Sequence, residues 1–498
     1  MKQNLLHAHP VSIFFFLYRF LYLLLIPLAR GIISALLGGP SRWLSGAWMD
    51  LFILGCIFLL AYEKWNHFKY HMDQTSFYYT EGIFYKRKIW IPMERICTLS
   101  IQQPLWMQPF GLVCLRIDTL ALAPDKPDLF MYLKKTEASR LMAIRRKETE
   151  IPEGEPEITC CPRILDIIFL SVFTSNSLIG ILFIATFISH AGKLFGRNLY
   201  DWLEALLLQI ALGLEAVSAL FEIAFKLPPI AMGIAAVLLG GWAAAFLLTL
   251  LQTKNLCITR SKKGIYITAG ILTKKEYSLQ FKDICFIDIR QSLLTRLFRL
   301  YSVFLNATGM GKERSDIKAL IPFSARRRCE KQLALLLPEY HASPRQIRPS
   351  ASSIMKFLLA PLWPCLLIPL GTYILTGFLP AWEPFLKFSG LMLSFPAYWF
   401  LGVRLMDFLS SGISYQDGYF TFRYSTRYYL HTVVLPRKNI ALIHFRQSPL
   451  QRGRNKCDLK IFSRSEGRKV HHIRNLLWKD AVRLFDAEDK SFPENSEK

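Results

Sequence analysis

Apolar and polar residues along this chain follow two patterns that take turns. Long apolar runs, each near the ~20 residues that a helix needs to cross a bilayer, come in pairs, and each pair precedes short segments of alternating apolar and polar residues. Such alternation is typical of half-buried β-strands, and an amphipathic segment closes each group. The pattern predicts about six transmembrane helices as three hairpins, and three strand-rich modules that each end in a helix. By residue number, the hairpins are 11–62, 164–251 and 354–409, and the modules are 63–150, 252–340 and 410–488.

A motif that recurs in all three modules supports the triplication. It fits Ile-x-x-(Leu/Ile)-x-(Ile/Phe)-(Gln/Arg)-Gln, and a glycine precedes it in each module. The repeated polar and turn positions are Gln103, Gln291, Gln447, Gly82, Gly270 and Gly418. The glutamines are either a contact site present three times or side-chain amides that satisfy backbone groups where a strand ends in a turn. We favour the second interpretation.

The segment at 200–226 does not fit the triplication. It is apolar but carries a narrow polar stripe that includes Glu204, Glu215 and Glu222, which predicts an interfacial helix lying on the membrane surface. A seventh spanning helix is the alternative, but it would place the first two modules on opposite sides of the membrane. With three hairpins, all modules share one side, and basic residues near the membrane ends place the modules and both termini inside.

Composition supports a membrane protein with basic aqueous parts. The 498 residues are 52% apolar and carry a net charge of +24. The basic excess follows either from membrane topology or from attraction to anionic lipid head groups. Basic residues beside the repeated motif could contact lipid phosphates, with solvated surface as the alternative. They are Arg95, Lys282, Arg290, Arg437, Lys438 and Arg446. The ten cysteines show no disulfide or zinc-ligand spacing, which predicts a reduced, cytoplasm-facing protein.

Catalytic chemistry has no candidate constellation in the sequence. Asn306–Lys312 resembles a phosphate-binding loop, but it lacks the first glycine, and Glu313 stands where Ser or Thr would hold Mg²⁺, so we predict a turn. His471 and His472 are adjacent, and neighbours on a strand point to opposite faces, which argues against a metal site. We therefore predict no enzyme activity, no cofactor and no metal.

Arg19 lies inside the first apolar run. A charge within the bilayer is by default a functional hypothesis. The alternatives are snorkelling of the side chain to the interface and pairing with an acid on another helix, such as Asp166 or Asp407.

The stretch from Ile91-Pro92 through Arg95-Ile96 to Gln103-Pro104-Leu105 and Phe110-Gly111-Leu112 resembles the bacterial pleckstrin-homology-like membrane-flanking domain proteins of the YdbS/YdbT type, in the three-module form. The second copy lacks the proline, and the third loses the Phe-Gly-Leu part. The resemblance implies a PH-like fold for each module, in which a bent antiparallel sheet is capped by a helix. It also implies a place in the bacterial plasma membrane and no catalytic residues. Envelope integrity or resistance to membrane-active peptides is the implied role.

The sequence thus predicts a non-enzymatic bacterial membrane protein whose modules mediate protein–protein assembly or contact with anionic lipid. A shorter YdbS-like membrane protein or a second copy of the chain is the expected protein partner, and no nucleic acid is expected. The alternative is a transporter or exporter of a lipid or peptide through a six-helix bundle.

Overall fold

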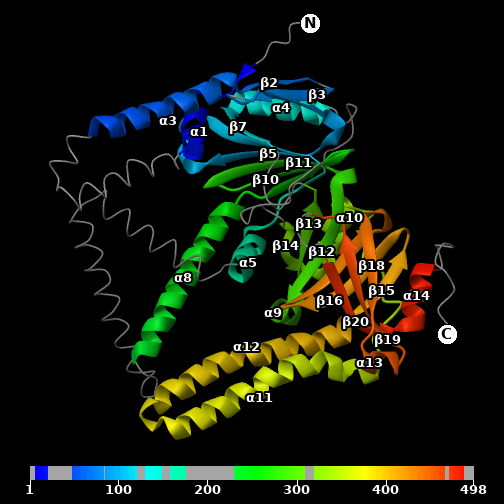
Figure 1. Cartoon of the computed structure of the whole chain (residues 1–498). Helices are drawn as coiled ribbons and strands as arrows, with labels where there is room; N and C mark the ends of the chain where they lie inside the picture. Colours follow the sequence, from blue (N-terminus) through cyan, green and yellow to red (C-terminus); the bar gives the residue numbers. More distant parts are fainter. Residues whose placement is uncertain are drawn as a thin grey trace. The chain divides into compact units, whose positions relative to one another are not determined.

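The computed structural model describes residues 6–20, 47–73, 75–83, 85–119, 129–147, 158–174, 229–308, 319–465 and 470–486. The chain divides into two compact units (Figure 1). The first contains residues 1–159, 258–283 and 308–314, and the second contains 160–257, 284–307 and 315–498.

Unit 1 is built on two antiparallel sheets. The first, in the order β1-β2-β3-β4, contains Leu6–His7, Lys69–Met72, Ser76–Glu81 and Arg87–Pro92. The second, in the order β7-β6-β5-β11-β10-β9-β8, contains β5 Ile96–Pro104, β6 Leu112–Thr119, β7 Leu129–Lys134, β8 Ile158–Cys160, β9 Cys257–Arg260, β10 Gly264–Ala269 and β11 Thr273–Gln280. Its helices are α1 Ser12–Phe20, α3 Ala47–His67 and α4 Lys135–Lys147, with short 3-10 turns η2 Met93–Arg95, η3 Leu105–Met107 and η4 Phe281–Asp283. One apolar core joins the first sheet, β5–β7 and α4, with Phe77, Leu115 and Ala138 fully buried.

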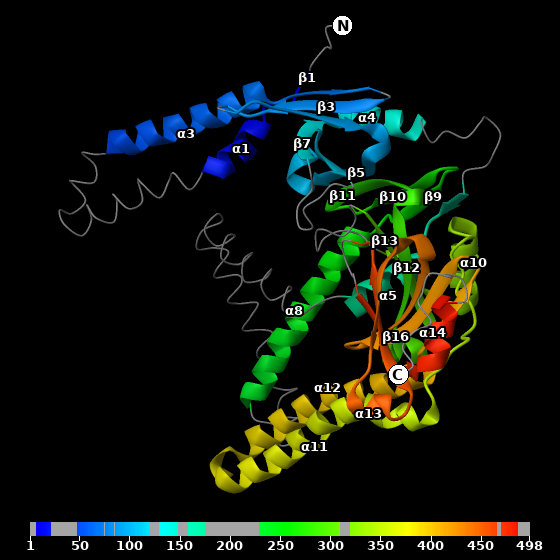
Figure 2. The same ribbon diagram turned by 45° about the vertical axis from the view of Figure 1, so that its right-hand side comes forward.

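Unit 2 contains the other two sheets. The larger, in the order β14-β13-β12-β17-β16-β15, contains β12 Ile284–Ser292, β13 Leu300–Ala307, β14 Ala319–Ala325, β15 Gly412–Gln416, β16 Tyr419–Thr426 and β17 Tyr429–Pro436. The smaller contains β18 Ile440–Arg446, β19 Lys456–Ser463 and β20 Val470–Leu477. Its helices are α5 Ile164–Thr174, α8 Pro229–Thr253, α9 Leu293–Leu297, α10 Arg326–Leu336, α11 Ile354–Phe378, α12 Glu383–Ser410, α13 Pro449–Arg452 and α14 Trp478–Asp486, with η5 Ala351–Ser353 and η7 Arg437–Asn439 among the 3-10 turns. Figure 2 shows α11 and α12 as a long antiparallel pair.

Three rounds of strands followed by a helix are present, and they end at α4, α10 and α14. We call these rounds repeats 1, 2 and 3. The repeated glycines lie in turns between early strands but, contrary to the prediction, their positions are not equivalent. Gly82 and Gly270 lie between the second and third strands of their repeats, whereas Gly418 lies one hairpin earlier, between the first and second strands. Gly418 has a φ of 81° and follows Asp417, which has a φ of 51°, so the two residues form the tight hairpin turn between β15 and β16. Gly82 and Gly270 also have positive φ, at 110° and 94°.

The repeats share sheets, because the later strands of one repeat pair with the earlier strands of the next. β5 of repeat 1 pairs with β11 of repeat 2, and β12 of repeat 2 pairs with β17 of repeat 3. A buried polar cluster lies at the second junction, where the carboxylate of Asp288 is 3.0 Å from Nδ1 of His431 and accepts a hydrogen bond of 2.6 Å from Nε of Arg290. Repeat 2 is consequently divided between the two units.

The predicted fold class, with six transmembrane helices as three hairpins and three separate modules, is wrong. Four sheets dominate the described residues, and among those residues one helix, Ala351–Phe378, is long and apolar enough to cross a membrane. The apolar run that includes α12 was predicted to cross the membrane, but the last turns of this helix pack on protein. Arg404 and Asp407 are buried there and both contact Ser425 of β16. Hydropathy reports burial and does not distinguish a protein core from lipid.

Two further expectations concern residues outside the described part or its side chains. The predicted interfacial helix at 200–226 lies outside the described residues, and Arg19 lies in α1 with its side chain outside them.

The expectation of a fully reduced chain differs from the structure, because Cys161 and Cys257 form a disulfide while the other eight cysteines are free. Their separation of 96 residues matches no recognisable cysteine spacing.

Candidate functional site

The α11–α12 pair presents large apolar side chains to its surroundings. Exposed residues of α11 include Leu359, Trp363, Leu366, Leu370, Tyr373 and Phe378, and those of α12 include Leu391, Leu393 and Phe395. Water-soluble surfaces rarely carry an apolar patch of this extent, so it marks contact with a membrane or a protein. The two ends of the pair that meet the sheets, near Ile354 and Ser410, form the base of the hairpin.

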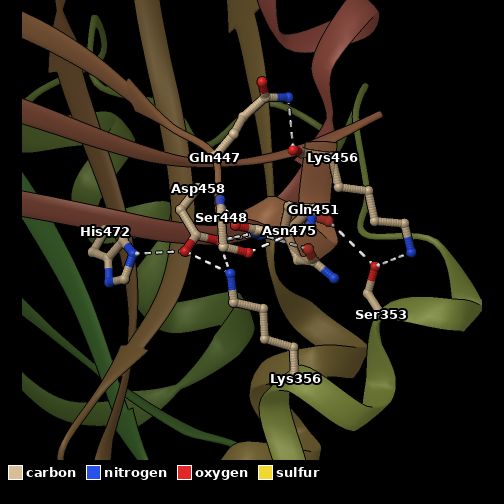
Figure 3. A network of polar contacts seen from close by, with 9 residues as sticks. All are labelled: Ser353, Lys356, Gln447, Ser448, Gln451, Lys456, Asp458, His472 and Asn475. Atoms are coloured by element: carbon tan, nitrogen blue, oxygen red, sulfur yellow. Dashed lines mark hydrogen bonds and ion pairs between the residues drawn. The ribbon is translucent and has the colours of Figure 1, made fainter. Parts of the chain in front are cut away.

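A polar network fixes the first turn of α11 to the smaller sheet (Figure 3). Nζ of Lys356 donates to both carboxylate oxygens of Asp458, at 2.8 and 2.7 Å. Asp458 also accepts hydrogen bonds from Nε2 of Gln451 and from the backbone N–H of Asn475, both at 2.9 Å. The network thereby ties a helix of the apolar hairpin to α13, β19 and β20.

A second lysine strengthens the same attachment. Nζ of Lys456 donates to the hydroxyls of Ser352 and Ser353, at 2.6 and 3.0 Å. Burial would raise the pKa of the Asp458 carboxyl, but hydrogen bonds from Lys356, Asn475 and Gln451 outweigh burial and lower it. Burial, followed by repulsion from Arg474, lowers the pKa of the neighbouring His472 to about 4. The network therefore holds a charged carboxylate and a neutral imidazole at neutral pH.

Two of the repeated glutamines make the same hydrogen bond. Nε2 of Gln291 donates to the carbonyl of Leu300 at 3.0 Å, and Nε2 of Gln447 donates to the carbonyl of Lys456 at 2.9 Å. Each bond closes the turn that contains α9 or α13. Gln103 is buried at the end of β5. The turns themselves expose apolar side chains, with Leu297 at 75% and Leu450 at 85% exposure.

A cavity of about 590 Å³ lies in unit 2 between the larger sheet, α10 and the end of α12. Four arginines from separate elements line it: Arg296 of α9, Arg326 of α10, Arg345 in the segment after α10, and Arg423 of β16. Arg326 is paired with Glu330, so the other three are the candidate anion ligands. Leu333, Ala334 and Leu337 line it from the side of α10 and the residue after it. One wall is therefore cationic and another is apolar.

The arginines keep unused hydrogen-bond donors. Nη1 of Arg423 is buried and has no partner among the described residues, while Nη2 donates to the carbonyl of Ser343. Nη1 of Arg345 donates to the carbonyl of Leu409 at 2.6 Å and so caps the C-terminus of α12. Within the described part of the chain, the guanidinium of Arg296 makes no hydrogen bond or ion pair. A buried guanidinium donor without an acceptor is costly, and an anion among these arginines would offset part of that cost.

The charge balance of the cavity is strongly positive. Among its described lining residues the one acid is Glu330, whose Oε1 accepts a hydrogen bond of 2.8 Å from Arg326. Burial, followed by repulsion from Arg345, lowers the pKa of Arg423 to about 10. The pKa of Arg345 is also lowered, by burial and then by Arg348 and Arg296. The guanidinium of Arg423 is still charged at neutral pH, and a bound anion would relieve its repulsion from Arg345.

The basic residues predicted from the motif do not form this cavity. Arg95, Lys282, Arg437 and Lys438 lie on 3-10 turns at the opposite end of the core strands from the glutamines. Arg290 pairs with Asp288 and stacks on the ring of Phe304 at 4.1 Å. Arg446 is exposed beside Gln447, at the end of β18. Of the motif residues, Ile289 and Gln291 line the cavity.

Sequence reasoning missed Arg296, Arg345 and Arg423 because they fall outside the motif. Arg423 lies on a strand where apolar and polar residues alternate, and Arg345 lies in a proline-containing connection. A usable signal was present in Arg423, since it is the charged residue in a strand that otherwise contains aromatic, threonine and serine residues.

Comparison with known proteins places the chain in a family. A model of the bacterial PH domain matches residues 20–149 and 207–336, together more than half of the chain. The chain therefore belongs to the bacterial PH-domain family, which confirms the predicted resemblance.

The chain is also similar to a protein of Bacillus subtilis (strain 168) named "UPF0699 transmembrane protein YdbT". The identity is 24% over 302 residues, which are 56% of this chain and 57% of the relative. The match thus spans little more than half of the relative's length. No solved structure matches the chain.

Proposed function

We propose that this protein is a non-enzymatic protein of the bacterial plasma membrane that binds the phosphate group of an anionic lipid in the arginine-lined cavity. The observation that carries the proposal is Arg423, which lines that cavity and whose buried Nη1 has no partner in the described residues. Guanidinium groups recognise phosphate oxygens through paired, charge-assisted hydrogen bonds.

The position of the cavity supports a lipid ligand. Leu409 and Ser410, at the end of α12, belong to its wall, so it lies at the base of the apolar hairpin. We propose that α11 is held in the membrane with α12 beside it, in keeping with the apolar length of α11 and the word "transmembrane" in the relative's name. The cavity would then lie at the level of the lipid head groups.

The turns at α9 and α13 add a second contact with the same surface. Leu297 and Leu450 are exposed, and Arg446, Arg452 and Arg454 surround the second of these turns. Apolar side chains among basic ones are the composition of segments that bind anionic membrane surfaces. Such a contact would serve envelope integrity or resistance to membrane-active peptides. Assembly with a shorter YdbS-like protein stays a prediction. We do not propose transport through a six-helix bundle, because the predicted six-helix fold is wrong.

Binding of dodecyl phosphate to the full chain in a neutral maltoside detergent tests the proposal by titration calorimetry. We expect one saturable site, and Arg296→Gln should weaken binding about ten- to hundredfold, since a charge-assisted hydrogen bond contributes roughly 1.5–3 kcal/mol. This variant suits the test because, among the residues that the structure describes, Arg296 has no hydrogen-bond partner to lose.

Arg327→Gln is the matched control, because Arg327 is exposed on α10 and does not line the cavity. Inorganic phosphate is the second probe. If dodecyl phosphate binds and inorganic phosphate does not, the ligand is a lipid phosphate. If both probes bind equally well, the ligand is a soluble phosphate and the proposed lipid ligand is wrong. Identical affinities for the wild type, Arg296→Gln and Arg327→Gln would refute the cavity as the site.

A further inference from the structure

The two internal junctions between repeats use the same register. Gln103 pairs with Lys274, which lies six residues before the end of β11, and Gln291 pairs with Leu430, six residues before the end of β17. In both junctions the core strand that carries the repeated glutamine pairs antiparallel with the third strand of the following repeat. The chain thus contains two independent examples of one edge-to-edge interface.

Each end of the repeat series leaves one half of that interface open. β18 is the counterpart of β5 and β12, and it is the outer strand of the smaller sheet in unit 2. β4 is the counterpart of β11 and β17, and it is the outer strand of the first sheet in unit 1. Within the described residues, β18 pairs with β19 alone and β4 with β3 alone. Open edges present unpaired backbone donors and acceptors to another strand.

The exposed side chains of the two edges fit the internal register. Applying the same offset pairs Gln447 with position 86, Ile443 with Trp90 and Leu442 with Ile91. Trp90 is 62% exposed and Leu442 is 58% exposed, whereas Ile443 and Ile91 are half-buried against the cores of their units. Each exposed apolar residue would therefore cover a half-buried isoleucine of the partner strand.

We propose that β18 of one copy of this chain pairs antiparallel with β4 of a second copy, in the register of the two internal junctions. The interface is heterologous, so two copies can close it reciprocally, or more copies can extend it. This inference does not rest on the proposed lipid binding, because neither edge contributes to the cavity.

One pair in this register opposes association. Arg446 would face Arg87, and like charges directly opposite each other on a sheet are destabilising. At the internal junction of β12 and β17, Asp288 offsets the equivalent pair, Arg290 and His431. The structure holds no such acid on β18. Association of two copies is therefore weakened at low salt and strengthened when salt screens the two arginines.

Disulfide cross-linking between differently tagged copies tests the register in the full-length protein. One copy carries Trp90→Cys and the other Ile443→Cys. Directly opposite residues on antiparallel strands are about 4.5–5.5 Å apart at their Cα atoms, which suits a disulfide. We expect a product that contains both tags. Leu442→Cys is the matched control, because its side chain points to the opposite face, and it should cross-link poorly with Trp90→Cys.

A charge replacement gives a second readout that needs no cysteine. Arg87→Glu should strengthen self-association about two- to fivefold at low salt, measured by mass photometry in detergent. Combining it with Arg446→Glu should return the association to the wild-type level or below. Three results would each overturn the proposal. The cross-linked products could carry one tag only, Ile443→Cys and Leu442→Cys could cross-link equally well with Trp90→Cys, or Arg87→Glu could leave self-association unchanged.

Discussion

Replacement of Asp288 by alanine should destabilise the junction between repeats 2 and 3. The carboxylate is fully buried, and His431 is also buried at 1% side-chain exposure. Alanine would leave His431 without its acid and Arg290 without its hydrogen-bond acceptor. Removing one partner of a buried pair costs about 3–5 kcal/mol, and Arg290, at 26% exposure, recovers part of its hydration, so we expect roughly 3 kcal/mol.

Guanidinium unfolding of the full chain in detergent measures this loss, and hydrogen exchange locates it. We expect faster exchange in β12 and β17, which pair at this junction, and unchanged exchange in β19. Asp417→Asn is the control, because Asp417 is exposed and asparagine tolerates its positive φ. A loss below about 1 kcal/mol, or faster exchange that leaves β12 and β17 unaffected, would refute the role of Asp288 as a lock between the repeats.

The same carboxylate gives the junction a pH dependence. Burial alone would raise the pKa of Asp288, but His431 and Arg290 outweigh it and hold the pKa well below the ordinary value of 3.8. The unfolded chain therefore binds the proton at a higher pH than the native chain. This contribution to stability is present above pH 3.8 and is lost as the pH falls below it, which Asp288→Asn should abolish.

Three further outcomes follow from the geometry. His472 has a native pKa of about 4 against an ordinary 6.5, so its contribution to the free energy of unfolding is present above pH 6.5 and is lost as the pH falls towards 4; His472→Gln should flatten this part of a stability profile. Gln447→Ala should cost about 1 kcal/mol in denaturant unfolding, because it leaves one backbone carbonyl without its donor. Gly82→Ala should lower the melting temperature more than Gly418→Ala. An added Cβ at Gly82 meets the backbone of Tyr85, whereas at Gly418 it meets open space and only the positive φ opposes it.

The repeat and its strand composition were predictable because the signal is local. Alternation from Ile96 to Gln103 identifies β5, and the glycine before it identifies a turn, since both follow from backbone geometry within a few residues. The family resemblance came from the same stretch. The pairing of strands from different repeats was not predictable in this way. The partner of β5 lies in a distant segment, and pairing within a repeat or with the next repeat would bury the same apolar face.

The cavity was unpredictable for a related reason. Arg296, Arg345 and Arg423 belong to three elements that are separated in sequence and meet only in the folded unit. Arg437 and Lys438 adjoin the motif in sequence, yet a core strand of seven residues, near 23 Å long at about 3.3 Å per residue, separates them from Gln447. Proximity in sequence along a strand is therefore a poor guide to a shared site. Contact of Arg437 and Lys438 with lipid phosphate stays a prediction.

Because the repeats share sheets, the order of synthesis determines when each strand can pair with its partner. The ribosome releases β5 long before residues 273–280, which form its partner β11, and it releases β12 long before β17. Each nascent repeat thus waits with an unpaired edge for the next one to emerge. A protein chain that ended between two repeats would leave that strand edge permanently unpaired, and such an edge is prone to aggregation.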